Sequence, residues 1–163
     1  MVTIRAYQPD DRPQVEACLF ELQAFEQRID KFTLPARATV IIYMTELLDT
    51  CERHNGRIYV AEKDGQIVGV VGVYLAHEND PLTSLADYVY VTDLVVLPDQ
   101  RGQGLGMRLL EKAEAYAREM SCALMVIGAL AANEAALGAY HKFGFQDRVI
   151  TLVKELNGEN EQQ

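Results

Sequence analysis

A glycine-rich stretch between an apolar run and a helical pattern is the part of this sequence that most directly suggests chemistry. Residues 92–110 read TDLVVLPDQRGQGLGMRLL, with glycines at Gly102, Gly104 and Gly106. At the start of a helix the first backbone N–H groups have no intrahelical acceptor, and the helix dipole adds positive potential. Because glycine lets a ligand approach the backbone closely, this stretch predicts a site for an anion such as a phosphate group.

Two common phosphate-binding motifs do not fit this stretch. A Walker A loop needs lysine and then serine or threonine after its last glycine, whereas Met107 and Arg108 follow Gly106 here. A dinucleotide-binding loop needs the spacing G-x-G-x-x-G in an early β–α–β unit. The spacing here is G-x-G-x-G, and it comes late in the chain, after a predicted hairpin. The spacing therefore argues against both kinds of nucleotide site.

Two separate motifs resemble those of one enzyme superfamily. Arg101–Gly106 reads R-x-x-G-x-G, which resembles the acyl-CoA pyrophosphate loop of the GCN5-related N-acetyltransferase (GNAT) superfamily. The second motif, N-x-x-A-x-x-x-Y-x-x-x-G-F, runs from Asn133 to Phe145 and begins one predicted helix and one predicted strand later. The superfamily carries both motifs at the same relative positions, and the order of elements matches over nearly the whole chain.

The resemblance implies the fold class. It is α/β (α+β), a single GNAT-like domain with a mixed, mostly antiparallel sheet of about six to seven strands and about four helices. Its fourth and fifth strands splay apart and hold acyl-CoA between them. We expect the domain to cover residues 1–157 and a flexible polar tail to cover 158–163. Hydrophobic periodicity predicts strands at 2–7, 57–80 (a hairpin turning at Asp64-Gly65), 86–98, 122–130 and 145–156, and helices at 10–29, 36–53, 104–120 and 133–143.

The resemblance also implies the cofactor-binding residues. Acetyl-CoA, or another acyl-CoA, is the co-substrate, and its pantetheine arm pairs with the main chain of Leu94, Val95 and Val96. Asn133 has two interpretations, as the cap of the following helix or as a further contact to that arm; Ala136 and Tyr140 belong to the same motif. Backbone amides hold the pyrophosphate, and these come from Arg101, Gly102, Gln103, Gly104, Leu105, Gly106 and Met107.

Two side chains are candidates for the chemistry itself. By the resemblance, Tyr140 is the general acid that protonates the departing CoA thiolate; the alternative is a half-buried aromatic residue with its hydroxyl in water. Strand alternation would place Asp93 on one face with Val91 and Val95, where desolvation raises a carboxyl pKa as a general base requires. Asp93 could equally be a structural acceptor, a water chain could serve as the base, and four nearby residues compete with it: Glu78, Asp87, Tyr88 and Tyr90.

These residues favour an acyl-CoA-dependent N-acetyltransferase that acts on a primary amine. No residue has the position of a covalent nucleophile, so direct attack in a ternary complex is preferred. A non-catalytic acyl-CoA-binding sensor or interaction module is the alternative. The acceptor, a small-molecule or peptide amine, should be selected by segments 25–35 and 76–87. Several acidic side chains could line its site or simply form a solvated face: Glu21, Glu26, Asp30, Glu78, Asp80 and Asp87.

Composition limits the other functions. The chain has 163 residues and a net charge of −9, which argues against a nucleic-acid partner. We find no membrane-spanning run and no signal peptide, and so expect a cytoplasmic protein without a membrane partner. Three cysteines without a C-x-x-C pair and three scattered histidines indicate neither a disulfide framework nor a metal site. A homodimer is expected only by analogy with the superfamily.

Overall fold

The computed structural model describes residues 1–79 and 81–156. Within them the chain forms a five-stranded sheet, four α-helices and 3-10 turns at Pro9–Asp11 and Pro98–Gln100. The strands are β1 (Val2–Ala6), β2 (Arg57–Lys63), β3 (Gln66–His77), β4 (Asp87–Val96) and β5 (Met125–Ile127). The α-helices are α1 (Arg12–Ile29), α2 (Ala36–Arg53), α3 (Leu105–Glu119) and α4 (Glu134–Phe143).

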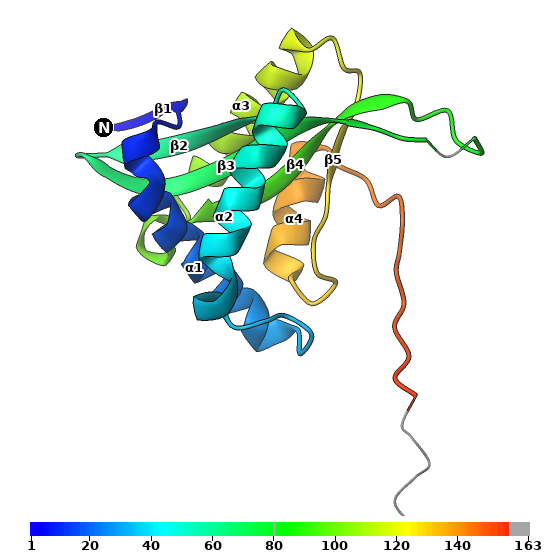
Figure 1. Ribbon diagram of the computed structural model, residues 1–163, viewed down its shortest axis with the longest axis horizontal. Helices are drawn as coiled ribbons and strands as arrows, with labels where there is room; N and C mark the ends of the chain where they lie inside the picture. The colour runs from blue at the N-terminus through cyan, green and yellow to red at the C-terminus, as the bar shows by residue number, and fades with distance from the viewer. Residues whose placement is uncertain (80, 157–163) are drawn as a thin grey trace, which may run out of the picture.

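The sheet is mixed and mostly antiparallel, as predicted. Its strands lie side by side in chain order, β1 to β5 (Figure 1). The first three pairings are antiparallel, and β4 pairs with β5 in parallel. The parallel pairing follows from the connection, because α3 carries the chain from the end of β4 back to the start of β5.

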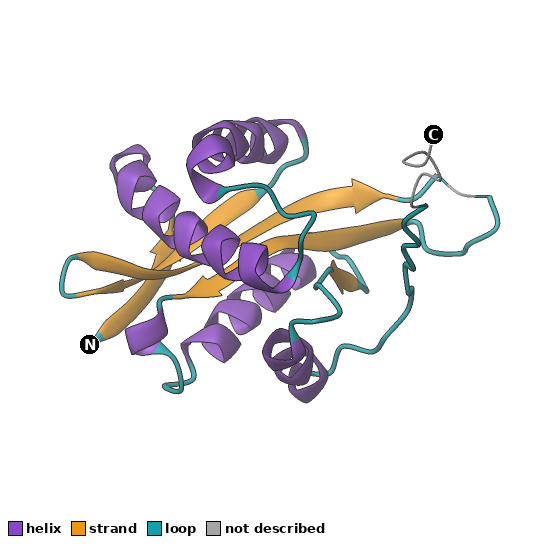
Figure 2. Ribbon diagram, turned by 90° about the horizontal axis from the view of Figure 1, so that it is seen from below, coloured by secondary structure: helices purple, strands orange, loops and turns teal. Residues whose placement is uncertain are grey.

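Helices cover both faces of the sheet (Figure 2). One core cluster joins α1 and α2 to the sheet and includes Val15, Met44 and Val95. The other joins α3 to the opposite face and includes Val91 and Leu109. The four predicted helices are confirmed. Three of them, α1, α2 and α3, present an apolar stripe to one of these clusters, and α4 buries Tyr140.

Local turn chemistry also agrees with the sequence. The β2–β3 hairpin turns at Asp64 and Gly65, whose φ angles are 52° and 79°. Both angles are positive, which is the requirement of the tight turn that Asp-Gly favours. Gly144 ends α4 in the left-handed region, with φ 114°.

The predicted final strand at 145–156 is wrong. These residues carry no strand, and their side chains are exposed from residue 146 to residue 156. In Figure 1 the segment runs as an orange-to-red trace that stands apart from the helices and the sheet. Its alternating sequence is suited to a strand, but an alternating segment becomes one only beside a strand that can accept its hydrogen bonds. The described part of the chain therefore has five strands, and the predicted count of six to seven is also wrong.

The predicted strand at 122–130 is present but short. β5 contains only Met125–Ile127, and its pairing with β4 ends at Val91 opposite Ile127. β4 itself continues to Val96, with β3 beside it on one edge only. The expected splaying of β4 and β5 is not confirmed by this pairing pattern. The predicted tail at 158–163 lies outside the described residues.

Candidate functional site

A β-bulge in β4 determines where the site's carboxylate points. Val71 of β3 lies opposite Leu94, whereas Val73 lies opposite Val91, so β4 carries one extra residue between these pairs. The bulge reverses the alternation along the strand. Val91 therefore packs toward α3, while Val95 packs toward α1 and α2.

Asp93 consequently faces α2, and the prediction that it shares a face with Val91 is wrong. The hydroxyl of Tyr43, from α2, donates a hydrogen bond to Asp93 Oδ2 at 2.6 Å. Burial raises the pKa of Asp93 above its ordinary value, while the hydroxyls of Tyr43 and Thr92 lower it. Burial likewise raises the pKa of Tyr43, with the Asp93 charge adding to the effect. Tyr43 thus remains a donor, and Asp93 is a carboxylate with an increased tendency to take a proton.

A pocket opens beside Asp93 between α1, α2 and β4. Its volume is about 260 Å³. Its walls combine aliphatic side chains with the polar ends of Glu26, Tyr43 and Asp93. The lining residues are Leu19, Leu22, Gln23, Glu26, Thr39, Val40, Tyr43 and Asp93. Sequence reasoning named Glu26 only among several acidic residues and missed Tyr43, although Tyr43 lies next to the buried helical stripe that includes Val40, Met44 and Leu47.

Tyr140 is the second predicted catalytic residue, and it lies near this pocket. It projects from α4 and is only 8% exposed. Its ring packs edge-on against Phe145, with the ring centres 6.0 Å apart. Burial, together with the charges of Glu26 and Asp93, raises the pKa of Tyr140 to about 12. The fold therefore brings Tyr140 and Asp93 into one electrostatic environment, although one comes from α4 and the other from β4.

The glycine-rich loop presents free donors at the start of α3. Among the described residues, no acceptor receives the backbone N–H groups of residues 102–107. Gly102 and Gly104 have φ angles of 74° and 75°, and such left-handed residues turn successive N–H groups toward a common side. The Arg101 N–H differs, because it donates to Pro98 O at 3.3 Å.

The edge of β4 beyond the end of β5 carries further free backbone groups. Leu97 N–H donates to Val68 O, on the β3 side. The backbone N–H and C=O groups of successive residues point to alternate edges of a strand. Leu94 and Val96 therefore turn these groups to the opposite edge, and Val95 turns its own toward β3. On that open edge the Val96 carbonyl accepts a hydrogen bond from Arg101 Nε at 2.9 Å.

The remaining candidates lie in other surroundings. Asn133 Oδ1 accepts a hydrogen bond from Ala136 N–H at 3.2 Å, which confirms its role as the cap of α4. Asp87 forms a hydrogen bond with His77 at 2.7 Å, beside a second cavity of about 740 Å³. Burial raises the pKa of all three cysteine thiols, which makes them poor nucleophiles.

Comparison with known proteins identifies the family. A model described as the Acetyltransferase (GNAT) family matches residues 20–145. The chain belongs to the Acetyltransferase (GNAT) family. It is 29% identical over 122 residues to a Bacillus subtilis (strain 168) protein provisionally named as an alanine N-acetyltransferase of ribosomal protein bS18. That match covers 75% of this chain and 72% of the relative.

Solved GNAT structures share the fold. An aminoglycoside 6′-N-acetyltransferase from Acinetobacter haemolyticus has a TM-score of 0.70 at 18% identity, over 95% of this chain and 99% of that one. An aminoglycoside N-acetyltransferase in complex with CoA has a TM-score of 0.68 at 16% identity, over 94% of this chain and 100% of that one. The chain is accordingly a GNAT N-acetyltransferase enzyme, as its two motifs predict. No helix in the described residues is long and apolar enough to cross a membrane.

Proposed function

We propose that this GNAT enzyme transfers an acetyl group from acetyl-CoA to a primary amine, by direct attack in a ternary complex. The observation that carries the proposal is the run of free N–H groups at residues 102–107, at the start of α3 and next in sequence to the open edge of β4. A pyrophosphate carries adjacent anionic groups, which suit several convergent backbone donors. The related structure with CoA supports the same co-substrate.

The open edge of β4 would hold the pantetheine arm. Within residues 1–79 and 81–156 no strand pairs with this edge of β4 beyond Val91, so Leu94 and Val96 have backbone groups available there. Arg101 would have to release the Val96 carbonyl for full pairing. Val95 would contribute packing rather than hydrogen bonds, because its backbone faces β3. The proposed splaying of β4 from β5, and contacts from Asn133 and Ala136, would complete the binding site.

Acetyl-CoA supplies a thioester whose carbonyl carbon is open to a neutral amine. A typical alkyl amine has a pKa of about 10.4 and is mostly protonated at neutral pH. Asp93 would accept a proton from the amine, and its raised pKa favours that task. The new C–N bond forms as the C–S bond breaks, and Tyr140 would donate its proton to the departing thiolate. The second proton that the nitrogen loses on becoming an amide would restore the Tyr140 hydroxyl. With a pKa of about 12, Tyr140 stays protonated at neutral pH until that step.

The test is release of the CoA thiol across a panel of primary amines, with Tyr140→Phe as the variant. Loss of the proton donor should lower kcat by about 10²–10⁴-fold. Acetyl-CoA affinity, measured by calorimetry, should hardly change. Tyr74→Phe is the matched control, since Tyr74 lines the second cavity instead.

Two results would contradict the proposal. Wild-type turnover in Tyr140→Phe would remove this residue from the chemistry. Acetyl-CoA binding without thiol release for any amine would favour the sensor or interaction module. A homodimer and a cytoplasmic location remain predictions, as do the single domain at 1–157 and the tail at 158–163.

A further inference from the structure

The pocket beside Asp93 has the shape and polarity for a small acceptor with an aliphatic middle. Its volume of about 260 Å³ corresponds to about nine water molecules at liquid density. Leu19, Leu22 and Val40 supply aliphatic walls, and Glu26 and Asp93 supply carboxylates. A short chain of methylene groups between two polar ends would match this lining.

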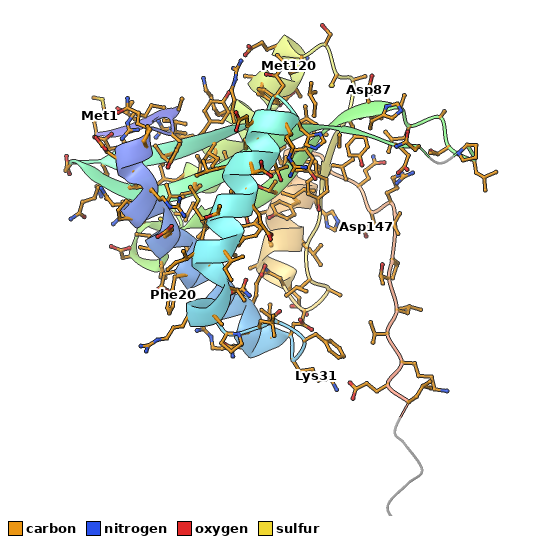
Figure 3. All side chains as sticks on the ribbon, viewed as in Figure 1. Met1, Phe20, Lys31, Asp87, Met120 and Asp147 are labelled. Atoms are coloured by element: carbon orange, nitrogen blue, oxygen red, sulfur yellow. The ribbon has the colours of Figure 1, made fainter. Side chains whose placement is uncertain are left out.

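The carboxylates in this pocket have no cationic partner. In the described ranges 1–79 and 81–156, neither Glu26 nor Asp93 forms an ion pair. The nearest basic residues in sequence are occupied elsewhere: Arg28 lies over the Phe25 ring, and Lys31 pairs with Glu155. Figure 3 shows Lys31 in the connection after α1, close to the lower end of the 145–156 segment.

The carboxylates of Glu26 and Asp93 act on one another across the pocket. Burial raises the pKa of Glu26, and the charges of Asp93 and Asp30 raise it further. Asp30 differs from Glu26 and Asp93 because its carboxylate accepts a hydrogen bond from the Thr33 hydroxyl at 2.7 Å. Unpaired carboxylates in a partly desolvated pocket are costly, and a bound cation offsets that cost.

Tyr140 lies in the same electrostatic environment as the two carboxylates. Its side chain is more than nine-tenths buried, yet its hydroxyl has no hydrogen-bond partner in the described part of the chain. The charges of Glu26 and Asp93 both raise the pKa of this hydroxyl. A hydroxyl that no described residue engages is available to hydrogen-bond a bound molecule.

We propose that the acceptor carries two amino groups joined by a short aliphatic linker, and that Glu26 binds the one that does not react. This inference rests on the proposed function. Asp93 becomes neutral when it takes the proton of the reacting amine, so it cannot also balance a second cation. Glu26 remains charged and is free to bind the other ammonium group. The aliphatic walls contact the linker, and a molecule the size of an aminoglycoside would exceed the pocket.

The experiment compares 1,5-diaminopentane, 1-aminopentane and 5-aminopentanoate as acceptors. These probes share one chain length and end in a cation, a methyl group and an anion. In the wild type, kcat/KM should be at least about tenfold higher for the diamine than for the monoamine, and lowest for the amino acid, because a hydrogen bond to a charged group contributes about 1.5–3 kcal/mol. Glu26→Gln should bring the diamine-to-monoamine ratio close to one. Glu21→Gln, an exposed position on the same helix, should keep the wild-type ratio.

A binding measurement separates this inference from the proposed function. The diamine should raise the melting temperature of the wild type and of Glu21→Gln, but not that of Glu26→Gln, whether or not turnover occurs. No diamine-dependent stabilisation of the wild type would overturn the inference. Equal kcat/KM values for diamine and monoamine would also overturn it, while leaving amine acetylation in place. Diamine binding without acetyl transfer would instead overturn the proposed function alone.

Discussion

Gly104 shows why the loop before α3 is rich in glycine. A side chain at Gly102 or Gly104 would meet nothing within 4 Å, so protein crowding does not explain these residues. Their φ angles of 74° and 75° explain them, because this left-handed region of backbone conformation is unfavourable for residues with a Cβ atom. The backbone conformation requires glycine, and that conformation is what turns the free N–H groups outward. Glycine would therefore shape the proposed anion site, in addition to leaving room for the proposed ligand.

At the residue scale, Gly104→Val should abolish acetyl-CoA binding. The variant loses the loop conformation and adds bulk where the phosphates would lie, so affinity should fall about 100-fold or more, given about 1.5–3 kcal/mol for each hydrogen bond to a charged group. Isothermal titration calorimetry measures this change.

Gly65→Val is the matched control for that experiment. Gly65 has a φ of 79° and equally open surroundings, but it lies in the β2–β3 turn. Both variants should lose about 1–2 kcal/mol of stability from the left-handed conformation. Only Gly104→Val should lose acetyl-CoA binding, and unchanged affinity in a folded Gly104→Val protein would contradict the prediction.

At the element scale, the sequence predicts periodic elements well and their irregularities poorly. The buried stripes of α1, α2 and α3, the Asn133 cap of α4 and the Asp64-Gly65 turn are local signals, and all of them agree with the structure. The bulge in β4 has no such signal, because it depends on how β4 meets β3. Alternation alone therefore assigned Asp93 to the wrong face. The pocket was equally beyond prediction, since Glu26 and Tyr43 are far from Asp93 in sequence.

The bulge should depend on Gly72 of β3. A Cβ atom at Gly72 would collide with Thr92 Oγ1, a buried hydroxyl oxygen. Gly72→Ala should therefore destabilise the protein by about 1–3 kcal/mol. It should also lower activity, because displacing Thr92 moves the neighbouring Asp93. Chemical denaturation and thiol-release assays measure the two effects.

Thr92→Ala supplies the internal control. Removing Oγ1 leaves the nearest atoms to the new Cβ at 3.6 Å, an ordinary contact distance. The double variant Gly72→Ala/Thr92→Ala should recover most of the lost stability, with a coupling free energy of about 0.5–3 kcal/mol. Additive effects of the two substitutions would show that the collision with Thr92 is not what requires glycine at this position.

At the scale of the whole molecule, residues 146–156 form a long segment whose side chains are exposed. Val149, Ile150, Leu152 and Val153 are 70–89% exposed, and their alternation suits a strand that has no neighbour. Phe145 packs against the rings of Tyr140 and Phe143. The contacts after it are polar: Asp147, labelled in Figure 3, with His141, Arg148 with Thr83, and Glu155 with Lys31. So much exposed apolar surface in one segment is unusual for a monomer and favours burial against a second copy.

We therefore expect a homodimer in which this segment is buried, and Ile150→Asp should make the protein monomeric. The substitution removes apolar surface that contacts little of its own chain, so the melting temperature of the monomer should stay near that of the wild type. Light scattering after size-exclusion chromatography gives the mass. Ile41→Asp is the control, because Ile41 is 64% exposed on α2, outside the segment. A monomeric wild type would refute the dimer. Dissociation by Ile41→Asp but not by Ile150→Asp would place the interface on α2, because burial of the 145–156 segment would then contribute nothing to association.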